Sequence, residues 1–262
     1  MARPKIVVGS VVILSLVVGV TAWAALGGAL HGRSASATNT TAPTSPPSTA
    51  STSTSTTTTP DPSTSTTTST TLPLVDTQPG ANGPPVAALQ QRLIDLGFWL
   101  PAVDGNYDPN TEHAVVAFQK ANGLPPDGVA GVATMEVLAD AGRPRPRSTS
   151  GTTYEVDLTR QLLLLVVDGR VEWAFDTSTG RIAGTTPVGD YKVYRQVNGN
   201  DHGPLGTLYR PKYFVRGVAV HGFSSVPAHP ASHGCVRVTD ATMDWLWAND
   251  AMPIGTPVTV YR

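Results

Sequence analysis

The stretch Ser232-His233-Gly234-Cys235-Val236-Arg237 contains the only cysteine of this 262-residue chain. A single cysteine cannot form a disulfide within its own chain, so the fold does not depend on one. A lone cysteine is usually a small buried hydrophobic residue, whereas in an exported protein it is either an intermolecular link or a reactive thiol. The neighbouring His233 favours a reactive thiol, because an imidazole can accept the proton of a thiol.

Alternating apolar residues and turn signals around this stretch predict a mainly β domain with one late helix over residues 152–262. Expected strands cover residues 154–158, 162–167, 171–175, 191–195, 217–221, 236–238 and 257–261, and the helix covers residues 240–248. Asp168-Gly169 predicts a two-residue hairpin turn between the second and third strands. Residues 196–212 are rich in Gly, Asn and Pro, which favours a long loop of the kind that often covers a site.

Cys235 can act as a nucleophile only as a thiolate, and the unperturbed pKa of a thiol is about 8.5. Two histidines are candidates for its base: His221, at the end of an expected strand, and His233. On a strand, His233 would lie on the same face as Cys235, two residues away. Gly234 lets the backbone approach a substrate carbonyl, and the N–H groups of Gly234 and Cys235 are candidate donors to an oxyanion. The residue types alone do not decide between the two histidines.

A zinc site is the alternative interpretation of the same residues, since His221, His229, His233 and Cys235 are all standard zinc ligands. Their spacing matches no common zinc pattern, so no metal and no other cofactor is expected. A chelator that abolished activity would reverse this interpretation.

The C-terminal domain resembles the catalytic domain of the L,D-transpeptidases. The matching segments are Thr186-Pro187-Val188-Gly189-Asp190-Tyr191, Val220-His221-Gly222 and Ser232-His233-Gly234-Cys235-Val236-Arg237. The resemblance implies that His221 is the general base and that the carbonyl of Gly222 orients it. It also implies that Cys235 attacks a tetrapeptide stem at its diamino-acid third residue. The terminal D-Ala then leaves, and the side-chain amine of a second stem resolves the thioester into a 3→3 cross-link.

Three further residues near the motif are candidate substrate contacts. Arg237 is expected either to brace the loop or to meet a substrate carboxylate. Ser232 is expected to hydrogen-bond within its turn, and Tyr213 either lines the pocket or is a core aromatic. Only ten residues separate His221 from Ser232, fewer than in many family members, and we expect this short connection to narrow the cleft.

Residues 81–142 show helical periodicity and an internal repeat. Asp108 is a candidate N-cap for a helix over residues 109–121, and further helices are expected from Pro84 to a stop at Gly97 and over residues 132–141. Asp104-Gly105 and Asp127-Gly128 each lie seven residues before a threonine. The segment resembles the three-helix peptidoglycan-binding domain, which implies binding to the stem peptide or glycan of the wall. A helical spacer is the alternative, because the matching residues also serve as turns, caps and core.

The N-terminal third differs in composition from the rest of the chain. Arg3 and Lys5 precede an uncharged, mostly apolar run, so residues 1–33 are expected to be a signal anchor or a cleaved signal peptide. Residues 34–80 are almost entirely Ser, Thr and Pro and are expected to form a disordered spacer, because they cannot bury enough apolar surface. A short Pro/Ser linker is expected at residues 143–151. The chain is thus predicted to be a multidomain protein of the cell envelope.

Three functions fit these expectations. The first is a transpeptidase that uses peptidoglycan stem peptides as donor and acceptor, attached to the membrane through its N-terminus. The second is a carboxypeptidase or hydrolase that transfers the same acyl group to water, and the third is a non-catalytic wall-binding protein. A net charge of −1 argues against nucleic acid as a partner. The oligomeric state is not encoded in any pattern of the sequence.

Overall fold

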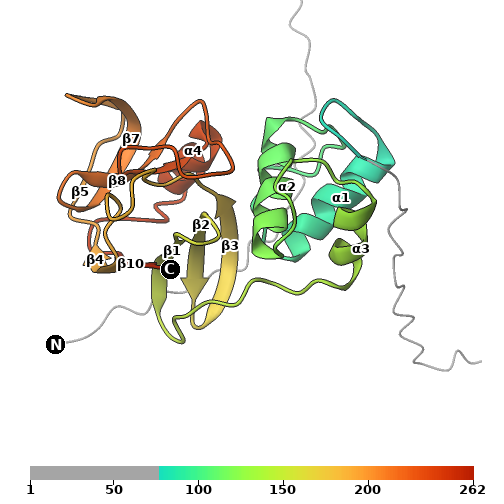
Figure 1. Ribbon diagram of the computed structural model, residues 1–262, viewed down its shortest axis with the longest axis horizontal. Coiled ribbons are helices and arrows are strands. Elements are labelled where there is room, and N and C mark those ends of the chain that lie inside the picture. The colour runs from blue at the N-terminus through green and yellow to red at the C-terminus, as the bar shows by residue number, and fades with distance from the viewer. Residues whose placement is uncertain (1–76) are drawn as a thin grey trace, which may run out of the picture. The chain divides into compact units, whose positions relative to one another are not determined.

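The computed structural model describes residues 77–262, all of which belong to one compact unit (Figure 1). The expected N-terminal segment at residues 1–33 and nearly all of the expected spacer at residues 34–80 lie outside the described residues. Within the described part, no helix is both long enough and apolar enough to cross a membrane. The described chain begins with helices and continues as a mainly β region with one late helix, as predicted.

The helical region consists of α1 (Pro84–Asp95), α2 (Pro109–Ala121) and α3 (Val132–Asp140), which confirms the three predicted helices. The side chain of Asp108 caps α2 by accepting a hydrogen bond from the backbone N–H of Thr111 at 2.8 Å. Gly97 follows α1 with a φ of +82°, a conformation that suits glycine and ends the helix. Local sequence signals therefore determine where these helices begin and end.

The internal repeat is built around one buried glutamine in each half. Gln90 Nε2 donates to Asp104 Oδ1 at 2.8 Å and to Thr111 Oγ1 at 2.9 Å, while the N–H of Gly105 donates to Gln90 Oε1 at 2.8 Å. The second half repeats these bonds with Gln119, Asp127, Thr134 and Gly128. Each glutamine thus ties an Asp-Gly turn to the start of the next helix, so the repeated residues hold the fold together.

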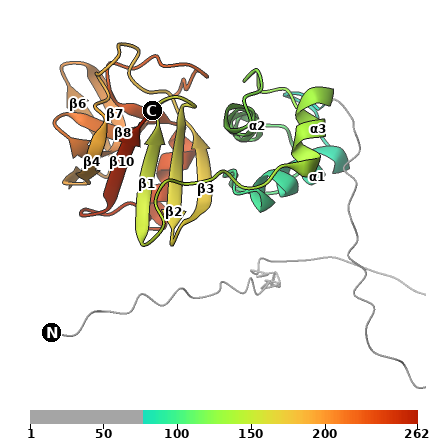
Figure 2. The same cartoon turned by 60° about the horizontal axis from the view of Figure 1, so that its bottom comes forward.

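The β region contains two sheets (Figure 2). Its elements are β1 (Thr152–Asp157), β2 (Leu162–Val167), β3 (Arg170–Asp176), β4 (Gly189–Lys192), β5 (Arg195–Gln196), β6 (Asn200–Gly203), β7 (Gly206–Val215), β8 (Val218–Gly222), β9 (Val236–Val238), α4 (Asp240–Ala248) and β10 (Pro257–Tyr261). The first sheet has the order β3-β2-β1-β10-β4, and the second has the order β5-β7-β8-β9, with β6 paired to β7. The pairs β1–β10 and β8–β9 are parallel, and all the others are antiparallel.

A hydrophobic core fills the space between the two sheets and α4. Met243 and Leu246 of α4 are fully buried against it, together with Val220 of β8 and Val236 and Val238 of β9. Burial of each such side chain stabilises the fold by about 1.5–3 kcal/mol. This packing fixes β8 and β9 side by side, so the residues at their ends are held on a rigid base.

Two predictions for the β region are wrong. Residues 196–212, predicted to be a loop, form most of the hairpin of β6 and β7, because β6 pairs with β7 and β7 also pairs with β8. The single strand predicted at residues 191–195 is interrupted. Its first part belongs to β4 and pairs with β10, whereas Arg195 begins β5 and pairs with β7 in the other sheet. Apolar alternation alone could not show that the chain changes sheets.

The helical region packs against the outer strands of the first sheet. Phe118 of α2 shares a buried cluster with Leu162 and Leu164 of β2 and with Ala174 of β3. The chain just after α1 pairs with the exposed edge of β3: the N–H of Ala174 donates to Gly97 O at 2.7 Å, and the N–H of Trp99 donates to Ala174 O at 3.1 Å. An edge that would otherwise offer free backbone groups is thereby covered.

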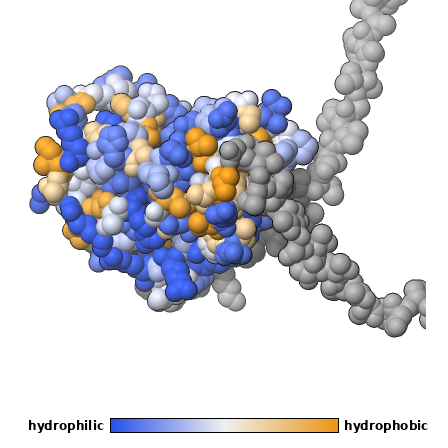
Figure 3. All heavy atoms as spheres, turned by 45° about the vertical axis from the view of Figure 1, so that its right-hand side comes forward, coloured by the Kyte–Doolittle hydropathy of each residue, from blue (hydrophilic) through white to orange (hydrophobic). Residues whose placement is uncertain are grey.

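The outer surface carries mixed polarity. On the face shown in Figure 3, hydrophilic residues predominate and hydrophobic residues are scattered among them in small groups. This distribution is ordinary for a folded protein in water, where single exposed apolar residues need no special explanation.

Candidate active site

A cleft of about 440 Å³ opens where β8 ends and β9 begins. Cys235, His221 and Arg237 all line this cleft. The remaining lining residues are Leu205, Gly206, Thr207, Leu208, Gly217, Val218, Phe223, Ser232, His233 and Gly234. The parallel pairing of β8 with β9 sets His221 opposite Arg237, which brings together two motifs separated in the sequence.

His221 is held in one orientation by its own neighbour. It is only 2% exposed, and its Nδ1 lies 2.8 Å from the carbonyl oxygen of Gly222. A carbonyl can only accept, so Nδ1 must carry the hydrogen, and the lone pair of the neutral ring is left on Nε2. Burial lowers the pKa of His221 to about 4, partly offset by the bond to Gly222. The ring is therefore neutral at neutral pH and able to accept a proton.

Cys235 precedes β9 and is partly buried. Its Sγ lies 3.8 Å from the carbonyl oxygen of Gly217, which directly precedes β8. Burial raises the pKa of Cys235, while a backbone hydrogen bond at Ala219 and the charge of Arg237 act in the opposite direction. The resting pair is thus a protonated thiol beside a neutral imidazole. The reactive thiolate is therefore not the resting form of Cys235, because desolvation outweighs the nearby positive charge.

His233 lies differently from the prediction. Residues 233–235 form a bend that leads into β9, so His233 and Cys235 do not occupy alternate positions of a strand, and the shared-face argument is wrong. His233 is exposed at the rim of the same cleft, whereas His221 is buried. The structure therefore offers one fixed and one solvent-exposed imidazole near the thiol.

The turn before Cys235 is tightly bonded. Ser232 Oγ donates to Cys235 O at 2.6 Å and accepts from the N–H of Gly234 at 3.0 Å, as expected of a serine that bonds within its turn. Gly234 has a φ of +146°, and a Cβ there would lie 2.7 Å from Thr185 O, so only glycine fits. The N–H of Gly234 is thus already used. Among the described residues, no acceptor bonds the N–H of Cys235.

Arg237 both supports the turn and faces the cleft. Its carbonyl accepts hydrogen bonds from Thr177 Oγ1 at 2.6 Å and from the N–H of Ser178 at 3.1 Å. Its guanidinium lies 4.1 Å over the ring of Phe223. Its Nε is the one buried side-chain nitrogen or oxygen of the described residues without a hydrogen-bond partner. The backbone of this residue therefore braces the loop, while its side chain retains an unused donor beside Cys235.

The structure does not bring every predicted residue to the cleft. Tyr213 lies on β7, where its hydroxyl donates to Asp201 Oδ2 at 2.7 Å and the guanidinium of Arg195 lies 4.7 Å from its ring centroid. It is not among the residues that line the cleft. Within the described part of the chain, no three His, Cys, Asp or Glu side chains are arranged to hold a metal ion.

Comparison with known proteins identifies the family of this chain. The family model described as "L,D-transpeptidase catalytic domain" matches residues 151–260, and the model described as "Putative peptidoglycan binding domain" matches residues 82–138. The crystal structure of an L,D-transpeptidase from Xylanimonas cellulosilytica is 49% identical, with a TM-score of 0.68. The similarity covers 71% of this chain and 97% of that one. The chain belongs to the L,D-transpeptidase family.

Curated relatives match over shorter stretches. The N-acetylmuramoyl-L-alanine amidase CwlL of Bacillus licheniformis is 45% identical over 73 residues, which are 27% of this chain and 20% of that protein. The spore cortex-lytic enzyme of Bacillus cereus is 40% identical over 77 residues, which are 29% of this chain and 30% of that protein. The chain thus spans less than a third of the length of these relatives.

Several residues in or next to the cleft were not among the candidate residues from the sequence. The tip of the β6–β7 hairpin, at Leu205 to Leu208, lines the cleft where a loop had been expected. Phe223 stacks on Arg237, and Thr186 Oγ1 donates to Gly234 O at 2.7 Å. Thr186 lay within a motif that matches the family, so a signal was present. The hairpin tip lies within residues 196–212, which were expected to cover a site, although as a loop and not as strands. Phe223 had no local signal.

Proposed function

We propose that this chain forms 3→3 cross-links between peptidoglycan stems, with Cys235 as the nucleophile and His221 as the general base. The observation that carries the proposal is the bond between His221 Nδ1 and Gly222 O, in the same cleft as the only cysteine. This bond fixes the tautomer that leaves Nε2 free to take a proton. Gly222 thus has the orienting role that a carboxylate has in many catalytic triads.

The first half of the reaction forms a thioester. As Cys235 Sγ attacks the carbonyl carbon of the third stem residue, the thiol proton passes to His221 Nε2. The carbonyl oxygen becomes an oxyanion in the tetrahedral intermediate. When this intermediate collapses, the bond between that carbon and the nitrogen of the terminal D-Ala breaks, and the proton on Nε2 moves to the leaving amine. The ring is neutral again, and the acyl group remains on sulfur.

The second half returns the enzyme to its resting state. The side-chain amine of a second stem attacks the thioester carbonyl and gives a proton to His221 Nε2. The carbon–sulfur bond breaks, the sulfur leaves as a thiolate, and the proton returns to it from Nε2. A new amide bond then joins the two stems. Because a protonated thiol and a neutral imidazole are the resting pair, both halves use the same proton site.

The N–H of Cys235 is the proposed oxyanion donor, because it has no acceptor among the described residues. Gly234 contributes the close approach of the backbone, since its own N–H is occupied by Ser232. Ser232 therefore shapes the turn. His233, at the exposed rim, is proposed to contact the stem peptide there.

Arg237 is proposed to bind a carboxylate of the donor stem. Its Nε is buried and has no hydrogen-bond partner among the described residues, its guanidinium lies over the ring of Phe223, and the residue lines the cleft. A guanidinium fixed by stacking is well suited to carboxylates, because its donors are fixed in position before the ligand arrives. Phe223 directly follows β8 and provides this support.

The remaining parts of the proposal concern the whole chain. Residues 81–142 are proposed to bind the wall, and residues 152–262 to act on it, with a linker at residues 143–151. The apolar segment at residues 1–33 and the spacer at residues 34–80 are proposed to place both outside the cytoplasmic membrane, either anchored or released.

Product analysis with the full chain tests this function. The purified protein is incubated with defined tetrapeptide stems that carry a diamino acid at position three, and products are identified by mass spectrometry. Cross-linked dimers with release of D-Ala are expected. Tripeptide without dimer would instead make the chain a hydrolase on the same route, and unchanged stems would support a non-catalytic wall-binding protein.

A further inference from the structure

A lysine of the helical region is buried beneath the catalytic domain. The side chain of Lys120, on α2, is only 3% exposed. Its Nζ donates to Asp176 Oδ1 at 2.5 Å, to Thr177 O at 3.0 Å and to Gln161 O at 3.3 Å. An ammonium group has three hydrogens, so each finds an acceptor, and all three acceptors belong to the β region.

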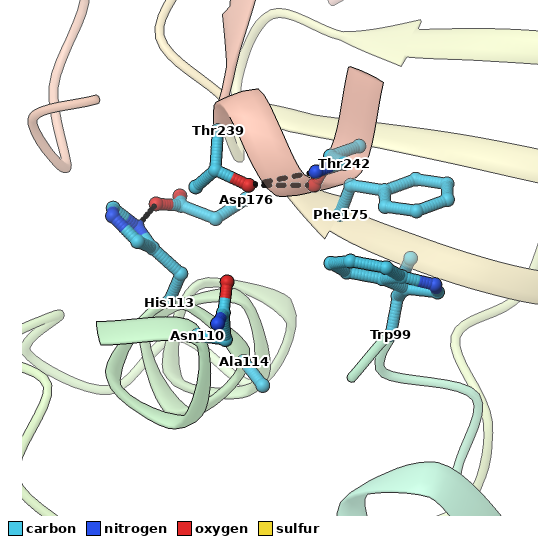
Figure 4. Close-up of a pocket in the computed structure, with 9 residues that line it drawn as sticks. Trp99, Asn110, His113, Ala114, Phe175, Asp176, Thr239 and Thr242 are labelled. Atoms are coloured by element: carbon cyan, nitrogen blue, oxygen red, sulfur yellow. Dashed lines mark hydrogen bonds and ion pairs between the residues drawn. The ribbon is translucent and has the colours of Figure 1, made fainter. Parts of the chain in front are cut away.

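Asp176, at the end of β3, is bound from the helical side at both oxygens. Its Oδ1 accepts from Lys120, and its Oδ2 lies 2.7 Å from Nδ1 of His113, which is also on α2. Figure 4 shows His113 pointing from α2 towards this carboxylate, next to the start of α4. The Asp176 side chain is 2% exposed, so water does not replace these partners readily.

The four residues that follow Asp176, Thr177–Gly180, run directly along the catalytic turn, and we name them the bracing segment. Thr177 Oγ1 donates to Arg237 O at 2.6 Å, and the N–H groups of Ala231 and Ser232 donate to Thr179 O at 3.0 and 2.9 Å. Gln161 also bonds this segment, because its Oε1 accepts from the N–H of Thr179 at 2.8 Å. Two of the three residues that accept from Lys120 are thus connected to the bracing segment. Thr177 belongs to it, and Gln161 holds it through a hydrogen bond.

We propose that Lys120 is a positioning residue for the Cys235 turn: it fixes the bracing segment, which in turn holds residues 231–237 in place. The inference rests on the proposed role of Cys235. It makes the helical region part of the catalytic unit, whether or not that region binds the wall.

The physical argument is that removal of Lys120 leaves groups that the site cannot satisfy otherwise. A buried carboxylate would lose its main cation, and the carbonyls of Gln161 and Thr177 would lose a donor. The bracing segment would have to move or admit water to recover these bonds. Misplacement of catalytic groups by about 1 Å can reduce a rate by up to about 100-fold, so a small shift of the Cys235 turn is enough to be measured.

The test compares full-length variants that separate stability from positioning. Lys120→Met/Asp176→Asn removes the cation without leaving an unpaired buried carboxylate. Arg92→Met is the matched control, because Arg92 also donates to three backbone carbonyls, those of Leu138, Ala139 and Ala141, but all of them lie outside the β region. Thr177→Val is a second probe, which breaks the bond to Arg237 O without touching Lys120. Each is assayed for kcat and KM on tetrapeptide stems, and for Cys235 alkylation by iodoacetamide, at a temperature at which it is folded.

We expect kcat to fall by about fivefold to about 100-fold in both Lys120→Met/Asp176→Asn and Thr177→Val. KM should stay within twofold of the parent value. The rate of Cys235 alkylation should fall in parallel with kcat. Arg92→Met is expected to lower the Tm but leave kcat within twofold. A folded double variant with kcat less than fivefold below that of the parent, or with a change confined to KM, would overturn the proposal. If the double variant does not fold, Lys120→Arg, which keeps the positive charge but changes the donor geometry, is judged by the same criteria, and Thr177→Val tests the bracing segment. If the separate variant Cys235→Ala remained active, the proposed function would be overturned. Alkylation of Cys235 in the Lys120→Met/Asp176→Asn and Thr177→Val variants would still report on the position of the turn.

Discussion

The helical region and the cleft use their polar groups in opposite ways. In the helical region, Gln90 and Gln119 donate and accept side-chain hydrogen bonds entirely within that region. In the cleft, Arg237 has a buried donor without a partner, and the N–H of Cys235 is unused among the described residues. A motif whose polar atoms are all satisfied explains a fold, whereas a motif with unused buried donors indicates a ligand.

The largest loss of activity is expected when the thiol of Cys235 is removed. Cys235→Ala removes the group that forms the proposed thioester, so cross-linking should fall by about 10³-fold or more, while the Tm remains near that of the parent. Steady-state turnover of tetrapeptide stems and a thermal melt measure the two quantities. Turnover by Cys235→Ala within tenfold of the parent would remove Cys235 from the mechanism.

The second prediction concerns Gln90, whose side-chain amide is fully used in hydrogen bonds of the helical region. Gln90→Ala should lower the free energy of unfolding by about 2–4 kcal/mol, because it leaves several buried partners without bonds. Gln91→Ala is the neighbouring control, since Gln91 is exposed and bonds only Asp95. Urea denaturation of both variants provides the measurement. Equal stabilities would show that the buried glutamine network does not hold the helical region together.

The third prediction concerns the unused donor. Arg237→Gln should lower kcat/KM for tetrapeptide stems by about 10-fold, since a charged hydrogen bond to a carboxylate contributes about 1.5–3 kcal/mol. The effect should shrink for a donor stem whose carboxylate is replaced by an amide, because that stem has nothing for the guanidinium to bind. Arg145→Gln, at an exposed position, is the control and should change kcat/KM by less than twofold. An equal loss of kcat/KM for the acid and amide stems would show that Arg237 only braces the loop and does not bind the carboxylate.

The smallest expected effect is a pH dependence. Burial lowers the pKa of His221 to about 4, so the ring stays neutral and able to accept a proton between pH 7 and about pH 4.5. The acid limb of kcat/KM should therefore lie near pH 4, whereas an unshifted imidazole would place it near pH 6.5. Kinetics in buffers from pH 3.5 to 7.5, on protein shown to be folded at each pH, measure this midpoint. A midpoint near 6.5 would mean that water reaches the ring.

Much of the fold could be predicted from the sequence because its signals are local. Asp108 and Gly97 mark helix ends through their own side chain or conformation, and the turn at Asp168-Gly169 fixes a hairpin. The β6–β7 hairpin was missed because its residues are Gly-rich and polar and lack the apolar alternation of a buried strand. They form strands because β6 pairs with β7 and β7 also pairs with β8, which leaves no periodic trace in the chain.

The residues of the candidate site also divide into those that sequence motifs reveal and those that only the folded structure brings together. Cys235 and His221 could be found from their motifs, and the carbonyl of Gly222 from the resemblance. The bracing segment, Phe223 and the free donor of Arg237 could not, since each depends on which residues the sheets bring together. Tyr213 was proposed from its position before His221, yet its hydroxyl is held by Asp201. Proximity in sequence was a poor guide there because β7 directs this side chain to a different partner.

Trapping of the acyl-enzyme tests the central claim most directly. The full chain is mixed with a tetrapeptide donor that lacks an acceptor amine, quenched in acid, and examined by intact mass and peptide mapping. We expect an adduct on Cys235 with the mass of the donor acyl group after loss of D-Ala, and we expect none in Cys235→Ala. Rapid release of D-Ala without any adduct on Cys235, or with an adduct on another residue, would contradict the account.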